Sequence, residues 1–300
     1  MLDNLEMNPK YPRMIPRREL RESVLQCCLD NIKDDSKREW FQKRFETLND
    51  QHSFFLSFGM VNRKFEESQI TMTSALQNQL KSINSAFSID SWTLVEFCRL
   101  AFLLFLETEN RKDKIIKLLS SADRKEQVLL YKSFQFLANA AEFQLSVIDG
   151  IRTNMIDVFD AIALEDVYPF KYFGEDSWNH MVLKAIFMER PLYKILGLDE
   201  RSNSKLAGIL QDFAHERWAA GRAVTPELWR LMSGFLNDSI IKDLHKVIET
   251  DSEIAKLAAI KVLEENNNPE TDNWLRTQGV SSQNVTWDEI GERTSKSSGN

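Results

Sequence analysis

Glycine and proline are scarce in this chain of 300 residues, with 10 and 7 residues of these types. Alternation of apolar and polar residues, which would indicate β-strands, is also rare. Apolar residues at helical spacing are common, and short connections separate the segments that carry them. We therefore expect an all-α protein, arranged as an irregular HEAT-like α-solenoid or α-α superhelix of antiparallel helix pairs. No fixed-period repeat is recognisable, so a globular helical bundle is the alternative.

Cysteine is scarce as well, with only Cys27, Cys28 and Cys98 in the chain. An odd number with two adjacent positions does not suit a disulfide framework, so we expect a reducing compartment. No secretory signal peptide is recognisable at the N-terminus. These features together predict a cytoplasmic protein.

Long apolar runs are absent too. The most apolar window extends from Trp92 to Leu106 and contains Glu96 and Arg99. It is shorter than the roughly 20 residues needed to span a bilayer, so we expect a buried core helix and no membrane span. The formal net charge is −7, and without a basic excess we expect no nucleic acid partner.

Motifs for cofactors and metals are also missing. Neither of the glycine-rich nucleotide-binding patterns, G-x-x-x-x-G-K and G-x-G-x-x-G, occurs. His215 and Glu216 begin like the zinc motif H-E-x-x-H, but Ala219 stands where the second histidine is needed. The four histidines are at no ligand spacing, and no Cys–His or Ser–His nucleophile motif is recognisable. We therefore expect neither a cofactor nor a metal.

The chain is expected to have four parts. Residues 1–16, with three prolines, should form an irregular N-terminal arm. Residues 17–86 should form an N-terminal helical bundle, and residues 87–277 a helical-repeat domain. Residues 278–300 are rich in Ser, Thr, Gly and charge, which predicts a disordered tail. Within the third part we expect one long helix over 141–164 and an ordered aromatic loop over 168–174.

The most informative stretch is 203–235, which predicts a helix hairpin. Leu206, Leu210 and Ala214 belong to the apolar stripe of its first helix. Gly221 is expected to end that helix, as glycine commonly does. Thr225 and Pro226 are the residue types that begin a helix, as N-cap and first helical residue.

Polar side chains cluster around this hairpin, and two interpretations are open for them. In the first, Arg217 and Arg222 bind an anion and His215 transfers protons, with Glu216 beside it. In the second, the charges form a structural network in which Arg217 pairs with a glutamate and caps carbonyls near Gly221. Trp218, Trp229 and Glu227 would then fix the angle of the hairpin.

Two further residues lie on a preceding helix. Trp178 belongs to its apolar stripe, and Asn179 lies next to it. Asn179 could fix an interhelical loop by a hydrogen bond or contact a ligand, and the sequence leaves both open.

The same region carries a family resemblance. The segments that resemble the signatures of the EboA-domain family are His215 to Arg222, Pro226 to Arg230, Trp178-Asn179 and Met181 to Ala185. The resemblance is clear over about 170–235 and looser over about 90–165 and 236–275, and the first 85 residues show none. His180 departs from the glutamine of the family pattern, which argues against a catalytic role for it.

The resemblance implies a context rather than a reaction. Such proteins are similar to accessory members of bacterial gene clusters that handle secondary-metabolite precursors. We therefore expect a non-catalytic scaffold or binding protein in such a biosynthesis or export system, with a hydrophobic precursor or other products of the cluster as partners. The alternative is an enzyme with His215 and Glu216 as acid–base pair and Arg217 and Arg222 as anion clamp. A weaker option is that Val285, Trp287 and Ile290 of the tail dock to a partner. The expected binding residues are Trp178, Asn179, His215, Glu216, Arg217, Trp218, Arg222, Glu227 and Trp229.

Overall fold

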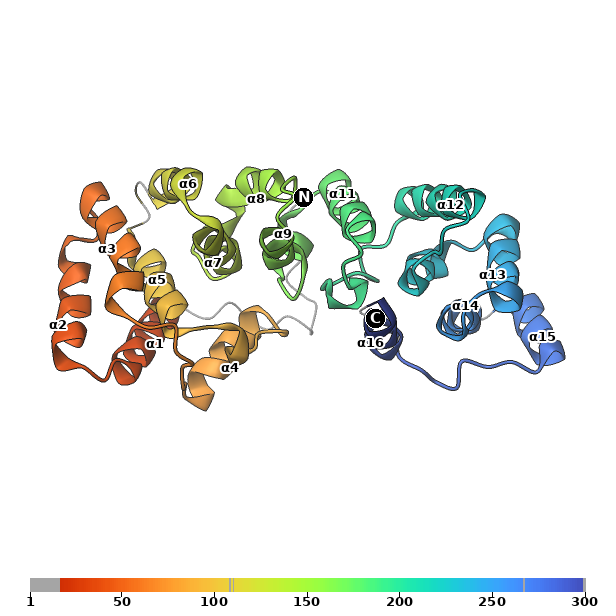
Figure 1. The fold of residues 1–300 in the computed structure, drawn as a ribbon, viewed down its shortest axis with the longest axis horizontal. Helices are drawn as coiled ribbons and strands as arrows, with labels where there is room; N and C mark the ends of the chain where they lie inside the picture. The colour runs from red at the N-terminus through yellow and green to blue at the C-terminus, as the bar shows by residue number, and fades with distance from the viewer. Residues whose placement is uncertain (1–16, 108, 110, 267, 299–300) are drawn as a thin grey trace. The chain divides into compact units, whose positions relative to one another are not determined.

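The computed structural model describes residues 17–107, 109, 111–266 and 268–298, so the arm predicted over 1–16 lies outside them. These described residues form helices and no β-strand (Figure 1), with one isolated bridge between Gln69 and Thr93. The all-α prediction is confirmed. The HEAT-like stacking stays a prediction. Across the same residues, no helix is both long and apolar enough to cross a membrane.

The chain divides into two compact units, the first ending at Tyr172 and the second beginning at Phe173. The predicted boundary near residue 86 does not separate compact units, because α1 and α3 pack on α5. The first unit contains α1 (Arg17–Asn31), α2 (Asp35–Arg44), η1 (Phe45–Thr47), α3 (Gln51–Lys64), α4 (Ser74–Ile83), η2 (Ile89–Ser91), α5 (Leu94–Phe105), α6 (Arg111–Ser121), α7 (Arg124–Phe134), η3 (Ala140–Phe143), α8 (Gln144–Gly150), α9 (Ile156–Ala163) and α10 (Tyr168–Tyr172).

Helix α5 forms the centre of the first unit, enclosed by α1, α3 and α7 (Figure 1). It begins with a capping box in which the Thr93 side chain accepts the N–H of Glu96, and the Glu96 carboxylate accepts the N–H of Thr93. Nearly all of its residues are buried, including Arg99. The apolar window is therefore a core helix, as predicted.

The long helix predicted over 141–164 is wrong, because the structure divides this segment into η3, α8 and α9. Helix α8 ends at Gly150, where the N–H groups of Arg152 and Thr153 bond to carbonyls three residues back. The ring of Tyr131 packs so closely on Gly150 that a Cβ atom there would lie 2.5 Å from it. The glycine thus marks a close contact and a helix end rather than a helix interior.

The loop predicted over 168–174 begins instead with the short helix α10. The Asp166 carboxylate accepts the N–H of Tyr168 at 2.7 Å, and the Tyr168 hydroxyl donates to the carbonyl of Ala140 at 2.6 Å. Pro169 is compatible with a first helical turn, where no N–H is needed. These hydrogen bonds favour a helical turn, although Pro169 and Gly174 are residue types typical of loops.

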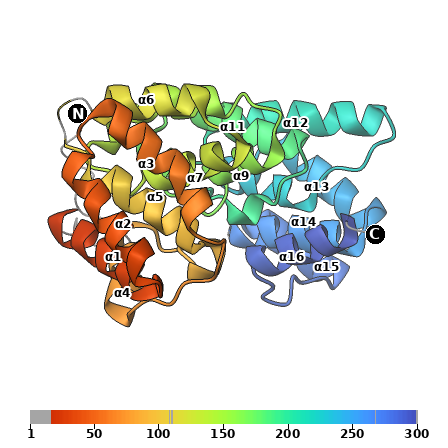
Figure 2. The same cartoon turned by 60° about the vertical axis from the view of Figure 1, so that its left-hand side comes forward.

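The second unit carries the residues singled out from the sequence. In Figure 2, α12 lies on one side of this unit and α14, α15 and α16 lie on the other. Its core is built where η5 packs against α12, α14 and α16. It contains α11 (Glu175–Phe187), η4 (Leu192–Lys194), α12 (Ser204–Ala219), η5 (Pro226–Phe235), α13 (Asp238–Thr250), α14 (Glu253–Glu265), α15 (Pro269–Gln278) and α16 (Trp287–Ser298).

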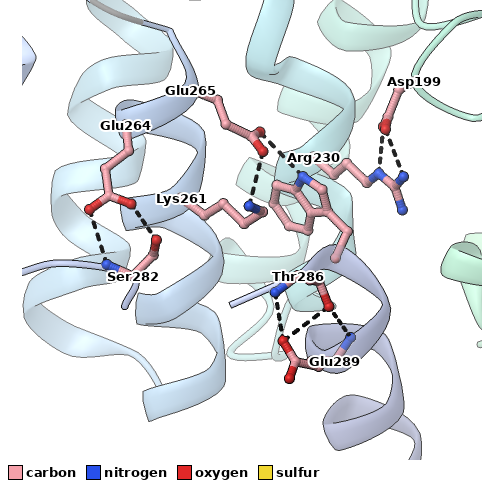
Figure 3. A network of polar contacts seen from close by, with 9 residues as sticks. Asp199, Arg230, Lys261, Glu264, Glu265, Ser282, Thr286 and Glu289 are labelled. Atoms are coloured by element: carbon pink, nitrogen blue, oxygen red, sulfur yellow. Dashed lines mark hydrogen bonds and ion pairs between the residues drawn. The ribbon is translucent and has the colours of Figure 1, made fainter. Parts of the chain in front are cut away.

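The predicted disordered tail is also wrong over most of its length, since α16 occupies Trp287–Ser298. Thr286 begins this helix by exchanging hydrogen bonds with Glu289 (Figure 3). The side chains of Val285, Trp287 and Ile290 are buried. Composition pointed to disorder because polar residues dominate the segment, yet burial of these three apolar side chains favours its packing on the unit.

Polar contacts strengthen this attachment (Figure 3). The Glu264 carboxylate accepts the N–H and hydroxyl of Ser282. The indole N–H of Trp287 donates to Glu265 at 3.2 Å. The Trp287 ring also lies 5.7 Å from the guanidinium of Arg230, which is paired with Asp199. Val285, Trp287 and Ile290 are therefore buried within the chain. They are not free to dock to a partner, which the hypothesis of a docking tail required.

Candidate functional site

A cavity in the second unit lies where α11 and α12 end and η5 begins, with α16 at its border. Its volume is about 620 Å³, within the range of small-molecule sites. Its apolar lining includes Ile186, Phe187, Pro191, Phe213, Val224 and Pro226. Its ionisable lining residues are Glu189, Arg190, Arg217 and Glu227.

Both helices end beside this cavity in the same backbone motif. After α12, the N–H of Gly221 bonds to the carbonyl of Trp218, and the N–H of Arg222 bonds to that of Arg217. This is a Schellman motif with Gly221 at φ 66°, as the sequence predicted for the helix end. After α11, Glu189 takes the equivalent place with φ 54°. A left-handed conformation is unfavourable for glutamate, so the backbone beside the cavity is strained.

Arg217 is the polar residue best placed to meet a ligand. Its Nε donates to the carbonyl of Ala223 at 2.9 Å, and the guanidinium lies 5.9 Å from the ring centre of Phe213. The side chain is half-buried. Among the described residues, its two terminal nitrogens have no hydrogen-bond partner, and it pairs with neither Glu216 nor Glu227. The hydrogen bond to Ala223 therefore orients the guanidinium, while its two terminal nitrogens stay available to a ligand.

An aromatic pair forms part of the apolar lining. Phe187 is 66% exposed, which is unusual for phenylalanine. Its ring meets that of Phe213 edge-on, with 5.1 Å between the centroids. Neither Phe187 nor Phe213 was among the binding residues expected from the sequence. A signal was present, since Phe187 falls outside the stripe of Trp178, Met181 and Ala185.

Glu227 lies at the start of η5 and is only 2% exposed. Its carboxylate accepts the N–H of Leu192 at 3.2 Å and that of Tyr193, which ties η4 to η5. Burial raises the pKa of Glu227 to about 7, and the two backbone N–H groups oppose this shift without cancelling it. Glu227 thus combines a structural role with a carboxyl group that is partly protonated near neutral pH.

Comparison with known proteins decides the family. The model of the family described as "Metabolite traffic protein EboA" matches residues 21–233. The chain belongs to the EboA family. No curated protein and no solved structure matches it. The match covers more of the N-terminal part than the sequence analysis recognised, since it begins at residue 21 rather than near residue 90, and it ends before α13.

The signature residues of this EboA-family chain do not gather around one point. His215 is exposed, and its Nε2 lies 2.8 Å from the Asp243 carboxylate. Neither His215 nor Glu216 lines the cavity, and Arg222 is exposed. Of the residues proposed from the sequence, only Arg217 and Glu227 reach it.

The two tryptophans of the EboA hairpin pack on each other. The rings of Trp218 and Trp229 stack with 5.7 Å between centroids and 27° between planes. The ammonium of Lys246 lies 4.0 Å from the ring centre of Trp218, and His215 lies on the same side chain at 5.8 Å. This arrangement corresponds to the structural interpretation, in which the tryptophans fix the hairpin.

Trp178 and Asn179 also have structural contacts. Asn179 is buried and exchanges two side-chain hydrogen bonds with Asn203, at 3.1 and 2.8 Å. Asn203 in turn caps α12 by accepting the N–H of Leu206. Trp178 is fully buried, with the guanidinium of Arg201 4.6 Å from its ring centre. Of the two roles considered for Asn179, the interhelical hydrogen bond is the one observed.

Proposed function

We propose that this protein binds a small organic metabolite without transforming it, and that the cavity beside Arg217 is the binding site. The observation that carries the proposal is the oriented Arg217, whose terminal nitrogens have no partner among the described residues and which lies beside the pair formed by Phe213 and the exposed Phe187. A cavity that combines apolar walls with a few placed polar groups is typical of ligand sites. Membership of a family described as metabolite traffic proteins agrees with this function.

The gene-cluster context implied by the family resemblance extends the proposal. In that context the compound is a hydrophobic precursor of a secondary metabolite, and other products of the cluster deliver or accept it in the cytoplasm. The enzyme hypothesis has less support. Its acid–base pair, His215 and Glu216, does not line the cavity with Arg217, and His215 is paired with Asp243.

Native mass spectrometry of the protein isolated from the cells that naturally make it would test the proposal. We expect a small-molecule adduct at a ratio of one per chain, reduced in the Phe213→Ala and Arg217→Gln variants. Arg222→Gln is the matched control, because Arg222 is an exposed arginine outside the cavity. An adduct that survives both cavity substitutions would place binding elsewhere, and a wild-type protein without any adduct would contradict the carrier function.

A further inference from the structure

We infer that the ligand of this cavity is an amphipathic organic anion, whose acidic group pairs with Arg217 and whose apolar body lies against Phe187 and Phe213. This inference rests on the proposed function and names the ligand class. It depends on three features of the cavity: a fixed guanidinium, an aromatic surface beside it, and a carboxyl group near it that is withdrawn into the protein.

The guanidinium is presented as a fixed binding group. Its Nε is held by the carbonyl of Ala223 at 2.9 Å. The backbone of Arg217 is held too, since its carbonyl accepts the N–H of Arg222 in the Schellman motif. The two terminal nitrogens, which have no partner in the described chain, form a planar fork that matches the two oxygens of a carboxylate or related acid. Orienting the side chain before binding lowers the entropy lost when the ligand arrives.

The aromatic surface fits an apolar ligand body. Phe187 leaves 66% of its surface in water, and covering such apolar surface stabilises a complex. Phe213 connects the aromatic surface with the guanidinium. The centre of its ring lies 5.1 Å from the ring centre of Phe187 and 5.9 Å from the guanidinium of Arg217. An acid group on the arginine therefore brings the rest of a ligand to the aromatic pair.

The charges around the cavity are compatible with an anion. Its ionisable lining residues are Glu189, Arg190, Arg217 and Glu227. Glu227 is buried, and its carboxylate is turned toward the N–H groups of Leu192 and Tyr193. Because burial raises the pKa of Glu227 to about 7, its repulsion of an anion is reduced near neutral pH. Glu189 is exposed to solvent, where its charge is screened.

Two fluorescent probes separate the anionic group from the apolar body. 8-Anilino-1-naphthalenesulfonate and N-phenyl-1-naphthylamine share the aryl body, and only the first carries an acid group. We expect one molecule of either probe to bind per wild-type chain, with the sulfonate bound about tenfold or more tighter, in line with a charge-assisted bond. Arg217→Gln should remove that advantage and leave the affinity for the neutral probe unchanged. Phe213→Ala should weaken both probes, and Arg222→Gln should change neither.

Each departure from this pattern has a distinct meaning. Equal affinities for the two probes, or a sulfonate affinity that Arg217→Gln leaves unchanged, would overturn the anion assignment. If Phe213→Ala still weakened both probes, the cavity would remain the binding site. If Phe213→Ala affected neither probe, or if neither bound, the cavity itself would lose its role and the proposed function would lose its site. Thermal unfolding of each variant verifies that the protein is folded.

Discussion

Arg99 in the first unit and Arg217 in the second occupy opposite environments, although both lie on helices that the family model covers. Arg99 is 2% exposed, pairs with Glu126 at 2.6 Å and donates to the carbonyl of Phe58 at 3.2 Å. Arg217 is half-buried, and its one side-chain hydrogen bond to the part of the chain that the structure describes is made by Nε. The partners of Arg99 lie within the fold, whereas Arg217 lines a cavity.

The difference shows two ways in which an arginine can be held on a helix. In the first unit, a charge is removed from water and compensated by an opposite charge, which makes it part of the core. In the second unit, the terminal nitrogens of Arg217 belong to a half-buried side chain and stay partly in water. We therefore expect the fold not to depend on them. The same residue type is therefore structural at position 99 and available for binding at position 217. The following predictions test this contrast, beginning with the largest effect.

The largest effect is expected for Arg99→Met. This substitution leaves the half-buried Glu126 carboxylate without its partner, and breaking a buried ion pair costs about 3–5 kcal/mol. Denaturant unfolding should show a loss of this size in the free energy of unfolding.

The double variant Arg99→Met with Glu126→Gln is the control. It removes both charges, so we expect it to recover part of the loss, because no unpaired carboxylate remains in the partly buried site. If both variants lost equal stability, packing of Arg99 on the Phe58 ring at 4.8 Å would be the dominant contribution.

The second prediction concerns Glu227, a buried carboxyl group with no ion-pair partner among the described residues. Since burial raises its pKa from 4.5 to about 7, the folded protein binds this proton more tightly than the unfolded chain does. The contribution of Glu227 to stability is therefore greatest at low pH and decreases as the pH rises from about 4.5 through 7. The shift corresponds to about 3 kcal/mol.

The Glu227→Gln variant isolates this effect from all other titrating groups. The free energy of unfolding of wild type and variant should be measured from about pH 4.5 to pH 8. Over this range, wild type should lose about 3 kcal/mol of stability relative to the variant. A constant offset, as expected from a lost hydrogen bond alone, would show that Glu227 has an ordinary pKa.

Much of the fold was predictable from the sequence, and the reasons are local. Helical spacing and low glycine content were enough for the all-α class. The end of α12 at Gly221 was predictable because glycine is the residue that most often takes the left-handed position of a Schellman motif. The end of α8 at Gly150 was not predictable, because the Tyr131 ring that packs on this glycine is distant in sequence. Helix α16 was missed for a similar reason, since Trp287 and Ile290 become informative only when α14 and η5 provide a surface for them.

The candidate site was predictable only in part. Arg217 and Glu227 were singled out because polar residues cluster around the hairpin. Their neighbours Phe187 and Phe213 were not, because helical spacing predicts which face a residue lies on but not where a cavity interrupts the packing. The sequence also grouped His215 and Arg222 with Arg217. In the structure, only Arg217 of these three lines the cavity.

The third prediction extends the contrast to the backbone beside the cavity. Glu189 and Gly221 occupy equivalent left-handed positions at φ 54° and φ 66°. Glu189→Gly should stabilise the protein by about 0.5–1 kcal/mol, because glycine adopts this conformation without strain. Gly221→Ala should destabilise it by about 1 kcal/mol, and no neighbouring atom within 4 Å would contribute a clash. If Glu189→Gly is neutral or destabilising, contacts of the glutamate side chain compensate for the strain.

The smallest effect is expected for Arg217→Gln. A residue that contributes one hydrogen bond and no ion pair should change the free energy of unfolding by about 0.5 kcal/mol or less, as surface substitutions do. At roughly 2–4 °C per kcal/mol, the melting temperature should shift by no more than about 2 °C. Arg222→Gln should behave in the same way. Stability alone therefore does not distinguish the two arginines, and a measurement of ligand binding is needed to do so. A loss for Arg217→Gln that approached the 3–5 kcal/mol expected at Arg99 would mean that both arginines hold the fold together, and the contrast between the two units would disappear.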